Sequence, residues 1–191
     1  TLAHRFETMA RGHAEALAPM VEAVMREAGM DFSALERLAV TTGPGTFTGQ
    51  RVGLAFMRGL RVALGIPLVG VTTLEVMAAQ AMDETQRARA AIAHDARRDE
   101  VYLQLIADEP ALPVVLGFAQ ARDVIADFSR GGLFVLAGTA GPRLAAELAG
   151  AQFLLSNVCA PDAAWVARLG QDLPASADPP APLYLRAPDA K

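Results

Sequence analysis

Apolar and polar positions alternate along the chain in blocks that predict short buried strands followed by helices. Residues 38–40 form an apolar run typical of a buried strand, and residues 50–65 are apolar almost throughout without a proline. A strand, a helix, a strand and a helix in this order predict an α/β layer with right-handed crossovers. The predicted helices span residues 12–29, 50–65, 74–82, 121–128 and 162–173, with one more ending near residue 150. The predicted strands span residues 38–40, 67–71, 91–93, 101–106, 113–118, 133–137 and 153–155.

The pattern changes after a polar segment at residues 83–89, which predicts two lobes, 1–88 and 89–191. A charged turn at residues 94–100 lies between two apolar strands, which is typical of a hairpin. The stretch 174–182 is rich in Pro, Ala and Asp, and we expect an irregular surface segment there.

The helices at residues 12–29 and 50–65 are too apolar for a helix with only one face on a core. Gly53 and Gly59 lie inside the second helix, where each costs about 1 kcal/mol against alanine unless another backbone approaches closely. Either both helices are buried in their own domain, or they pair with helices of another chain. The charged residues of the first helix are Glu15, Glu22, Arg26 and Glu27, and those of the second are Arg51, Arg58 and Arg61.

Composition limits the class of protein. The chain has 191 residues, of which 52% are hydrophobic and 20% charged, as in a packed globular protein. Its net charge of −4 provides no overall basic field for nucleic acid. The single Cys159 excludes an internal disulfide and fits a reducing compartment, so we expect a cytoplasmic protein. No apolar stretch approaches a membrane span, no signal peptide is evident, and the first residue, Thr1, predicts that the natural N-terminus is absent.

The glycine-rich junction between the first strand and the second helix is the first candidate site. Gly43, Gly45 and Gly49 force a tight turn, and we expect Thr48 to cap the helix. Amides at a helix start attract anions. A Walker A loop would need a second glycine five residues after Gly43 with a lysine directly behind it, but Thr48 stands at that position and Gly49 follows it. The junction is therefore either a plain structural turn or an anion site of another kind.

Residues for catalysis or metal binding are scarce. The histidines, His4, His13 and His94, have no metal-site spacing, and no serine lies in a nucleophile elbow. Asp95, Asp99 and Glu100 are close together but suit a solvated turn. We predict no catalytic residue and no metal site. Arg97 and Arg98, or the arginines of the second helix, could contribute a minor RNA contact within a larger complex.

Five short motifs are spread along nearly the whole chain. The motifs are RGHAE at 11–15, TGPGTFTGQRVG at 42–53, IPLVGVTTL at 66–74, DARRDEVY at 95–102 and PLYLR at 182–186. These motifs, in this order, resemble those of the TsaB family, the dimerisation subunits of the bacterial machinery that makes threonylcarbamoyladenosine beside the tRNA anticodon.

The resemblance implies a two-lobed actin-like ATPase fold, of the ASKHA or ribonuclease H-like kind, whose first strand hairpin is missing here. Residues 1–8 would be the last strand of that hairpin. In this fold Asp95-Ala96-Arg97 lies at the second phosphate hairpin, where Gly, Ser or Thr usually follows the Asp, so the ATPase site is expected to be degraded. The histidine pair that holds the metal in the TsaD paralogues has no counterpart.

By resemblance, the chain is a non-catalytic subunit that dimerises with and activates a TsaD-like threonylcarbamoyltransferase. A TsaE-like ATPase completes the assembly, ATP and a metal are expected on the partner subunits, tRNA is contacted indirectly, and the chain alone forms a homodimer. The alternatives are a divergent actin-fold ATPase or kinase, a peptidase, and a homodimeric scaffold unrelated to tRNA. The expected partner interface comprises His13, Leu17, Met20, Val21, Val24, Arg51, Val52, Phe56, Met57 and Leu60. The expected anion or nucleotide vicinity comprises Gly43, Gly45, Thr46, Thr48, Asp95 and Arg97.

Overall fold

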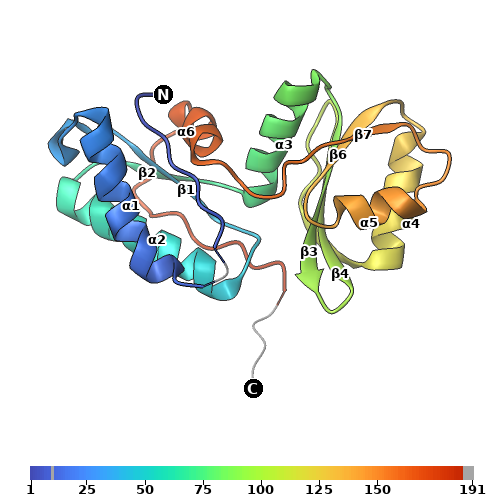
Figure 1. Ribbon diagram of the computed structural model, residues 1–191, viewed down its shortest axis with the longest axis horizontal. Coiled ribbons are helices and arrows are strands. Elements are labelled where there is room, and N and C mark those ends of the chain that lie inside the picture. The colour runs from blue at the N-terminus through green and yellow to red at the C-terminus, as the bar shows by residue number, and fades with distance from the viewer. Residues whose placement is uncertain (10, 187–191) are drawn as a thin grey trace. The chain divides into compact units, whose positions relative to one another are not determined.

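The structure, a computed structural model, describes residues 1–9 and 11–186 and divides the chain into two compact units (Figure 1). Unit 1 comprises residues 1–72 and 162–183. Unit 2 comprises residues 73–161 and the chain from 184 onward. The chain therefore leaves unit 1, returns to it, and leaves it again.

Unit 1 is built on two parallel strands, β1 and β2, in which Leu38 lies opposite Leu68. One face of this pair packs on α2, where Leu38, Val40, Leu54 and Leu68 form a buried cluster. The other face packs on α6, so closely that a Cβ atom on Gly170 would lie 2.7 Å from the Cβ atom of Ala39. The elements of unit 1 are α1 (His13–Ala28), a 3-10 turn (Phe32–Ala34), β1 (Leu38–Thr41), α2 (Phe47–Leu64), β2 (Leu68–Val71) and α6 (Ala163–Gln171).

Local sequence explains where these helices begin and end. Both α1 and α2 end at a glycine in the left-handed conformation, Gly29 and Gly65. Asp162 caps α6 by accepting a hydrogen bond from the Ala164 amide, as predicted. The prediction that Thr48 caps α2 is wrong: the helix begins at Phe47, and the Thr46 hydroxyl accepts from the Gly49 amide at 3.3 Å. The helix thus starts three residues earlier than the glycines suggested.

Unit 2 contains a five-stranded mixed sheet in the order β5-β4-β3-β6-β7. The first three strands in this order are antiparallel, and β3, β6 and β7 are parallel. Helix α3 covers the face carrying Ile92 and Val135, while α4 and α5 cover the face carrying Phe134 and Leu136. The elements of unit 2 are α3 (Thr73–Thr85), β3 (Ala90–Arg97), β4 (Glu100–Ile106), β5 (Val114–Gly117), α4 (Phe118–Ser129), β6 (Phe134–Ala137), α5 (Gly141–Glu147) and β7 (Phe153–Leu155).

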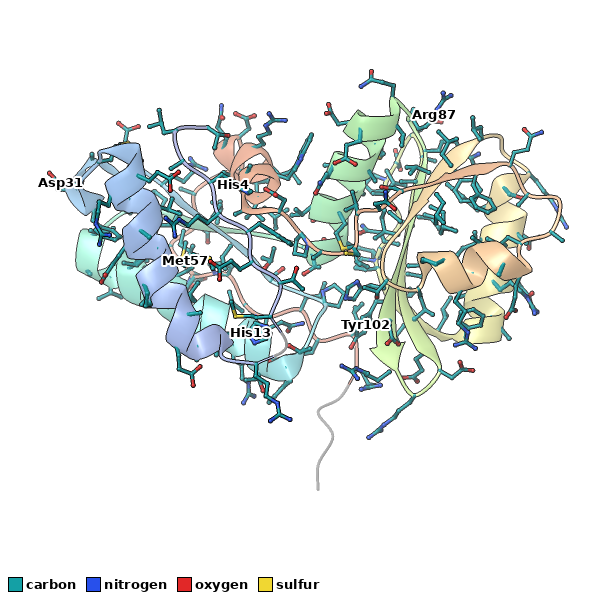
Figure 2. All side chains as sticks on the ribbon, in the orientation of Figure 1. His4, His13, Asp31, Met57, Arg87 and Tyr102 are labelled. Carbon is teal, nitrogen blue, oxygen red and sulfur yellow. The ribbon has the colours of Figure 1, made fainter. Side chains whose placement is uncertain are left out.

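The structure departs from the sequence-based expectation at two further places. Residues 1–9 contain no strand, so the strand expected at 1–8 is wrong; this segment is held by contacts of His4 with Asp162 and of Arg5 with Glu27 instead. His4 is labelled beside α6 in Figure 2. The turn of the β3–β4 hairpin is much shorter than the predicted 94–100, because both strands continue into it.

The division into units also differs from the boundary predicted at residue 88. Helix α3 belongs to unit 2, because its apolar residues Leu74, Met77 and Ala78 pack against β3 and β6. Helix α6 belongs to unit 1, because it packs on β1 and β2. The last five residues of the predicted C-terminal lobe, 187–191, lie outside the described residues.

Candidate functional site

Helix α1 lies against α2 yet buries none of its side chains completely (Figure 1). It has 16 residues, and its large apolar side chains remain at least partly accessible to solvent. A helix of this composition in a small domain normally buries its apolar stripe. The apolar side of α1 is therefore only partly covered by the chain itself. The half-covered large apolar residues are Leu17, Met20, Val21, Val24 and Met25.

Helix α2 presents an exposed stripe that is mostly small or apolar. Its members are exposed and follow one another by three or four residues, which places them on one side of the helix. Val62 is 80% exposed. The guanidinium group of Arg51 lies over the ring of Phe47, and its central carbon is 3.6 Å from the centre of the ring. Arg51 is the only charged member of the stripe. The exposed α2 stripe consists of Thr48, Arg51, Ala55, Gly59 and Val62.

The predicted interface residues lie on several sides of these helices. Met57 and Leu60 pack against the buried cluster of unit 1, so their first role is to support the core (Met57 is labelled in Figure 2). Val52 and Phe56 are half-buried, and so are the four apolar residues predicted on α1. His13 and Arg51 are exposed. Ala55, Gly59 and Val62 belong to the exposed α2 stripe but were not among the predicted interface residues, although Gly59 was noted as a place where another backbone could approach.

Gly59 and Gly53 have open surroundings within this chain. A Cβ atom built on either residue would meet nothing within 4 Å. No described residue outside the helix packs closely at either position, so no such contact among these residues offsets the low helix propensity of glycine. Gly59 is exposed, whereas Gly53 is half-buried.

Two of the three arginines on α2 hold the C-terminal tail of unit 1. Arg58 donates to the carbonyl oxygen of Pro180 at 2.7 Å, and Arg61 donates to that of Ala177 at 2.5 Å. The tail continues to Leu183, whose amide donates to the carbonyl oxygen of Thr42. These side chains, which the sequence offered as phosphate contacts, thus bind backbone more than a hundred residues away.

The glycine-rich junction is filled by its own side chains. Thr42, Gly43 and Pro44 are buried, and the Gly43–Pro44 peptide bond is cis. The amide of Gln50 lies over the loop, so that a Cβ atom on Gly43 would be 2.4 Å from its Nε2 atom. Glycine is favoured at position 43 because φ is +108°, a conformation that other residues rarely adopt, whereas the Gln50 amide is the end of a flexible side chain that can move. Gly45, Thr46 and Thr48, the other predicted anion-site residues here, are more accessible.

The β3–β4 hairpin holds the other two residues of the predicted nucleotide site, Asp95 and Arg97. The Asp95 amide donates to the Thr139 hydroxyl, and the Asp95 carboxylate accepts from the Arg97 amide, both at 2.9 Å. Two amides that a phosphate hairpin would offer to its ligand are therefore already hydrogen-bonded. The two predicted anion-site groups belong to different units, and each is described within its own unit.

The tip of this hairpin has an unusual backbone. Arg97, Arg98 and Asp99 have φ of 67°, 55° and 59°, a region that residues other than Gly, Asn, Asp and His seldom adopt. Positive φ at Arg98 and Asp99 is typical of the two-residue turn whose twist matches a hairpin. Ion pairs flank the tip: Arg143 bonds Asp99, and Arg186 bonds Glu100, each at 2.7 Å.

His94 is the titratable residue in this region with a shifted pKa. It lies on β3 opposite Tyr102, and burial lowers the pKa of its imidazole, while the neighbouring Asp95 carboxylate opposes that shift. Its Nδ1 atom is buried without a hydrogen-bond partner among the described residues.

The described residues contain no group of three or more His, Cys, Asp and Glu side chains placed to hold a metal ion. None of the helices in the described parts of the chain has the length and apolar content that a membrane crossing requires.

Comparison with known proteins gives matches in sequence and in fold. A family model described as tRNA N6-adenosine threonylcarbamoyltransferase matches residues 6–109. An enzyme of that name from Erythrobacter litoralis is 49% identical over 69 residues, which cover 36% of this chain and 20% of the enzyme. The chain thus spans about a fifth of that relative.

Other relatives are matched over more of their length. An uncharacterized protein of Mycobacterium tuberculosis is 35% identical over 190 residues, which cover 100% of this chain and 82% of that protein. The Escherichia coli tRNA threonylcarbamoyladenosine biosynthesis protein TsaB is 36% identical over 102 residues, 53% of this chain and 44% of TsaB.

A crystal structure from Pseudomonas aeruginosa, of a protein described as similar to peptidase YEAZ, matches the fold. The TM-score is 0.79 at 28% identity, and the match covers 95% of this chain and 88% of that one. The mixed α/β architecture and the matched segments point to the same group of proteins. The chain belongs to the TsaB/YeaZ family.

Proposed function

We propose that this chain is a non-catalytic subunit in the formation of threonylcarbamoyladenosine in tRNA, and that it acts by pairing α1 and α2 with the catalytic subunit. The partner is a TsaD-like threonylcarbamoyltransferase, and a TsaE-like ATPase completes the assembly. The pathway is supported by the printed name of the Escherichia coli relative and by that of the family model.

The observation that supports this pairing is that the apolar side chains of α1 and α2 are incompletely buried. No side chain of α1 is fully buried, and the exposed α2 stripe is small and apolar apart from Thr48 and Arg51. Covering such a surface with a second apolar surface is favourable, by about 25 cal/mol for each Å² of apolar area removed from water. The small side chains of Ala55 and Gly59 let a facing helix approach closely. The same surface serves a second copy of this chain when the catalytic partner is absent.

The state of the glycine junction and the hairpin agrees with an accessory role. Gln50 occupies the space over Gly43, and the amides of Asp95 and Arg97 are already bonded. We therefore place ATP and the metal ion on the partner subunits, and tRNA contacts mainly with them.

The test is sedimentation velocity of the chain alone and mixed with the TsaD-like protein of the same cell. The Ala55→Glu and Val62→Glu variants place a carboxylate in the exposed α2 stripe without touching the core. Leu112→Glu is the matched control, because Leu112 is 85% exposed and lies in unit 2. We expect a homodimer that gives way to a heterodimer, weakened by the first two changes and unaffected by the third.

A second readout addresses the pathway. The chain, the TsaD-like protein and the TsaE-like protein are combined with tRNA, threonine, bicarbonate and ATP together with the enzyme that makes threonylcarbamoyl-adenylate, and the modified nucleoside is measured by mass spectrometry. We expect formation to depend on the chain and to fall in Val62→Glu. A monomer that ignores the TsaD-like protein contradicts the pairing, and modification that proceeds equally without the chain contradicts its role.

A further inference from the structure

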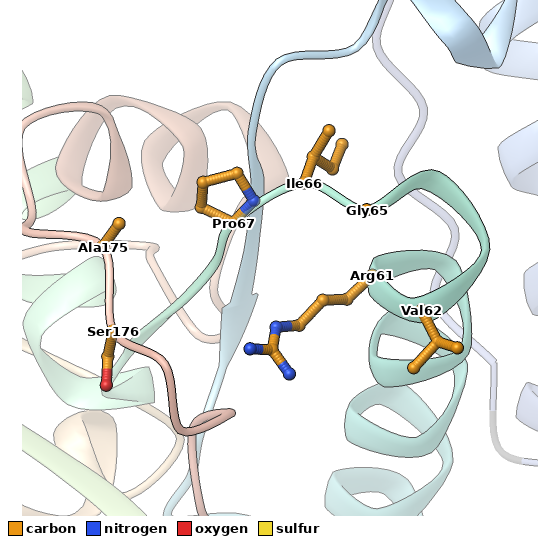
Figure 3. Close-up of a pocket in the computed structure, with 7 residues that line it drawn as sticks. All are labelled: Arg61, Val62, Gly65, Ile66, Pro67, Ala175 and Ser176. Atoms are coloured by element: carbon orange, nitrogen blue, oxygen red, sulfur yellow. The ribbon is translucent and has the colours of Figure 1, made fainter.

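Unit 1 contains a pocket of about 380 Å³ between the end of α2, the start of β2 and the C-terminal tail. Arg61, Val62 and Gly65 line it from α2 and its cap, Ile66 and Pro67 from the link to β2, and Ala175 and Ser176 from the tail (Figure 3). Its volume is within the range of about 300–1,000 Å³ that small-molecule sites occupy. Two segments distant in sequence, 61–67 and 175–176, form its walls, so it is a product of the tertiary fold.

Arg61 supplies the charge of this pocket. It is the one ionisable side chain among the described residues that line it, and Figure 3 shows it extending from α2 across the pocket toward the segment with Ser176. Its guanidinium donates one hydrogen bond to the Ala177 carbonyl. A guanidinium has five N–H donors, so a planar pair of donors is left for an oxyanion. Paired donors of this kind match the two oxygens of a carboxylate.

The remaining walls are mainly aliphatic. Val62, Ile66, Pro67 and Ala175 offer hydrocarbon surface, and Ser176 offers one hydroxyl. A single cation with apolar walls suits one negative charge joined to a compact hydrocarbon body. It suits a phosphate poorly, since a phosphate carries more charge and is usually met by several donors.

We propose that this pocket binds a small monocarboxylate with a compact apolar body, whose carboxylate pairs with Arg61 and whose hydrocarbon part lies against Val62, Ile66 and Pro67. This site uses none of the predicted nucleotide-site residues, and Val62 is the one residue that it shares with the exposed α2 stripe. A bound carboxylate would also fix Arg61, and through Ala177 the tail, in the arrangement seen here.

The test is a titration of the full chain with benzoate and with 3-methylbutanoate, followed by amide chemical shifts in 1H–15N spectra. Benzamide is the matched ligand control, because it has the same ring without the charge. We expect saturable shifts centred on Val62, Gly65, Ile66 and Ser176 with either carboxylate, and none that saturate with benzamide.

Three variants separate the site from the fold. Arg61→Gln is expected to weaken carboxylate binding by about tenfold or more, since the charged donor pair is lost. Arg58→Gln is the matched control, because Arg58 also holds the tail, through Pro180, but does not line the pocket. Ala175→Leu fills the pocket while leaving Arg61 in place, and it should abolish binding even if Arg61→Gln loosens the tail. Equal affinity in Arg61→Gln and the parent chain, shifts scattered over both units, or a parent dissociation constant weaker than about 10 mM would each overturn the proposal.

Discussion

His94 has a lowered pKa, and its Nδ1 atom is buried without a hydrogen-bond partner in the part of the chain that the structure describes. Because burial lowers the pKa of His94 below its ordinary 6.5, the folded chain binds the proton less readily than the unfolded chain does. The free energy of unfolding should then be highest above pH 6.5 and should fall as the pH decreases through 6.5 toward the lowered pKa. Below both values the loss is complete.

This prediction is checked by urea unfolding of the parent chain and of His94→Gln between about pH 8 and about pH 5. The parent should lose stability relative to the variant as the pH falls through this range. His13→Gln, at the exposed start of α1, is the control and should follow the parent. A constant difference between the parent and His94→Gln at every pH would show that the imidazole titrates alike in the folded and unfolded chains.

Gly138 tests how tightly β6 is held to β3. Its φ is +102°, and a Cβ atom there would lie 2.1 Å from the carbonyl oxygen of Ala93, an atom of backbone that has little room to move. Gly138→Ala should lower the free energy of unfolding by about 2 kcal/mol or more. Gly150 has a φ of +79° but open surroundings, so Gly150→Ala carries only the cost of the backbone conformation. Thermal and urea unfolding of both variants measure the difference, and equal losses would mean that the close approach to Ala93 relaxes freely.

The partners of single side chains were the least predictable feature of the sequence. Arg58 and Arg61 were recognised as charged residues of one predicted helix, yet their acceptors, Pro180 and Ala177, lie 122 and 116 residues further on. Periodicity reports which residues share a face of an element, but it carries no information about the distant backbone that meets this face. The Asp162 cap could be predicted because its partner, the Ala164 amide, is two residues away.

Helix α2 was predicted from its apolar composition, but its sides were not distinguished. Its core side holds Leu54 and supports Met57 and Leu60, whereas its exposed side carries Ala55, Gly59 and Val62. A helix that is apolar all round gives no contrast from which to tell a core face from a partner face. For the same reason Met57→Glu, which sequence reasoning would choose to disrupt pairing, would also disturb the core.

Gly59→Ala separates helix stability from association. Because Gly59 is exposed and open, alanine should raise the free energy of unfolding of the dilute chain by about 0.5–1 kcal/mol. If a partner helix approaches the exposed α2 stripe at Gly59, the added methyl group should weaken pairing at the same time. Urea unfolding at low concentration measures the first effect, and sedimentation measures the second.

Gly53→Ala is the matched control for Gly59→Ala. It is equally open but half-buried and outside the exposed α2 stripe, so it should stabilise the helix without weakening association. Unchanged association in Gly59→Ala would show that no partner backbone comes close at this point of the helix.

At the scale of the molecule, the alternation of strands and helices predicted the α/β class, while the boundary predicted between two lobes at residue 88 differs from the division into units. The polar segment at residues 83–89 resembles a linker, yet α3 before it packs on the sheet of unit 2. The chain returns to unit 1 through α6, and nothing in the amino-acid composition marks this return. The unit to which a helix belongs depends on the elements that it packs against, not on the polarity of the loops beside it.

If the surfaces of α1 and α2 pair with a second copy, as proposed, the stability of the whole molecule should depend on its concentration. Association that occurs only in the folded state stabilises it by mass action, so Tm should rise as the chain is concentrated from about 1 µM to about 100 µM. Val62→Glu should flatten this rise, because it introduces a charge into the exposed α2 stripe, whereas Leu112→Glu in unit 2 should leave it intact. A parent chain with the same Tm at every concentration would mean that this surface stays open in the absence of another protein. In that case the proposed catalytic subunit, rather than a second copy of this chain, would be the protein that binds the surface of α1 and α2.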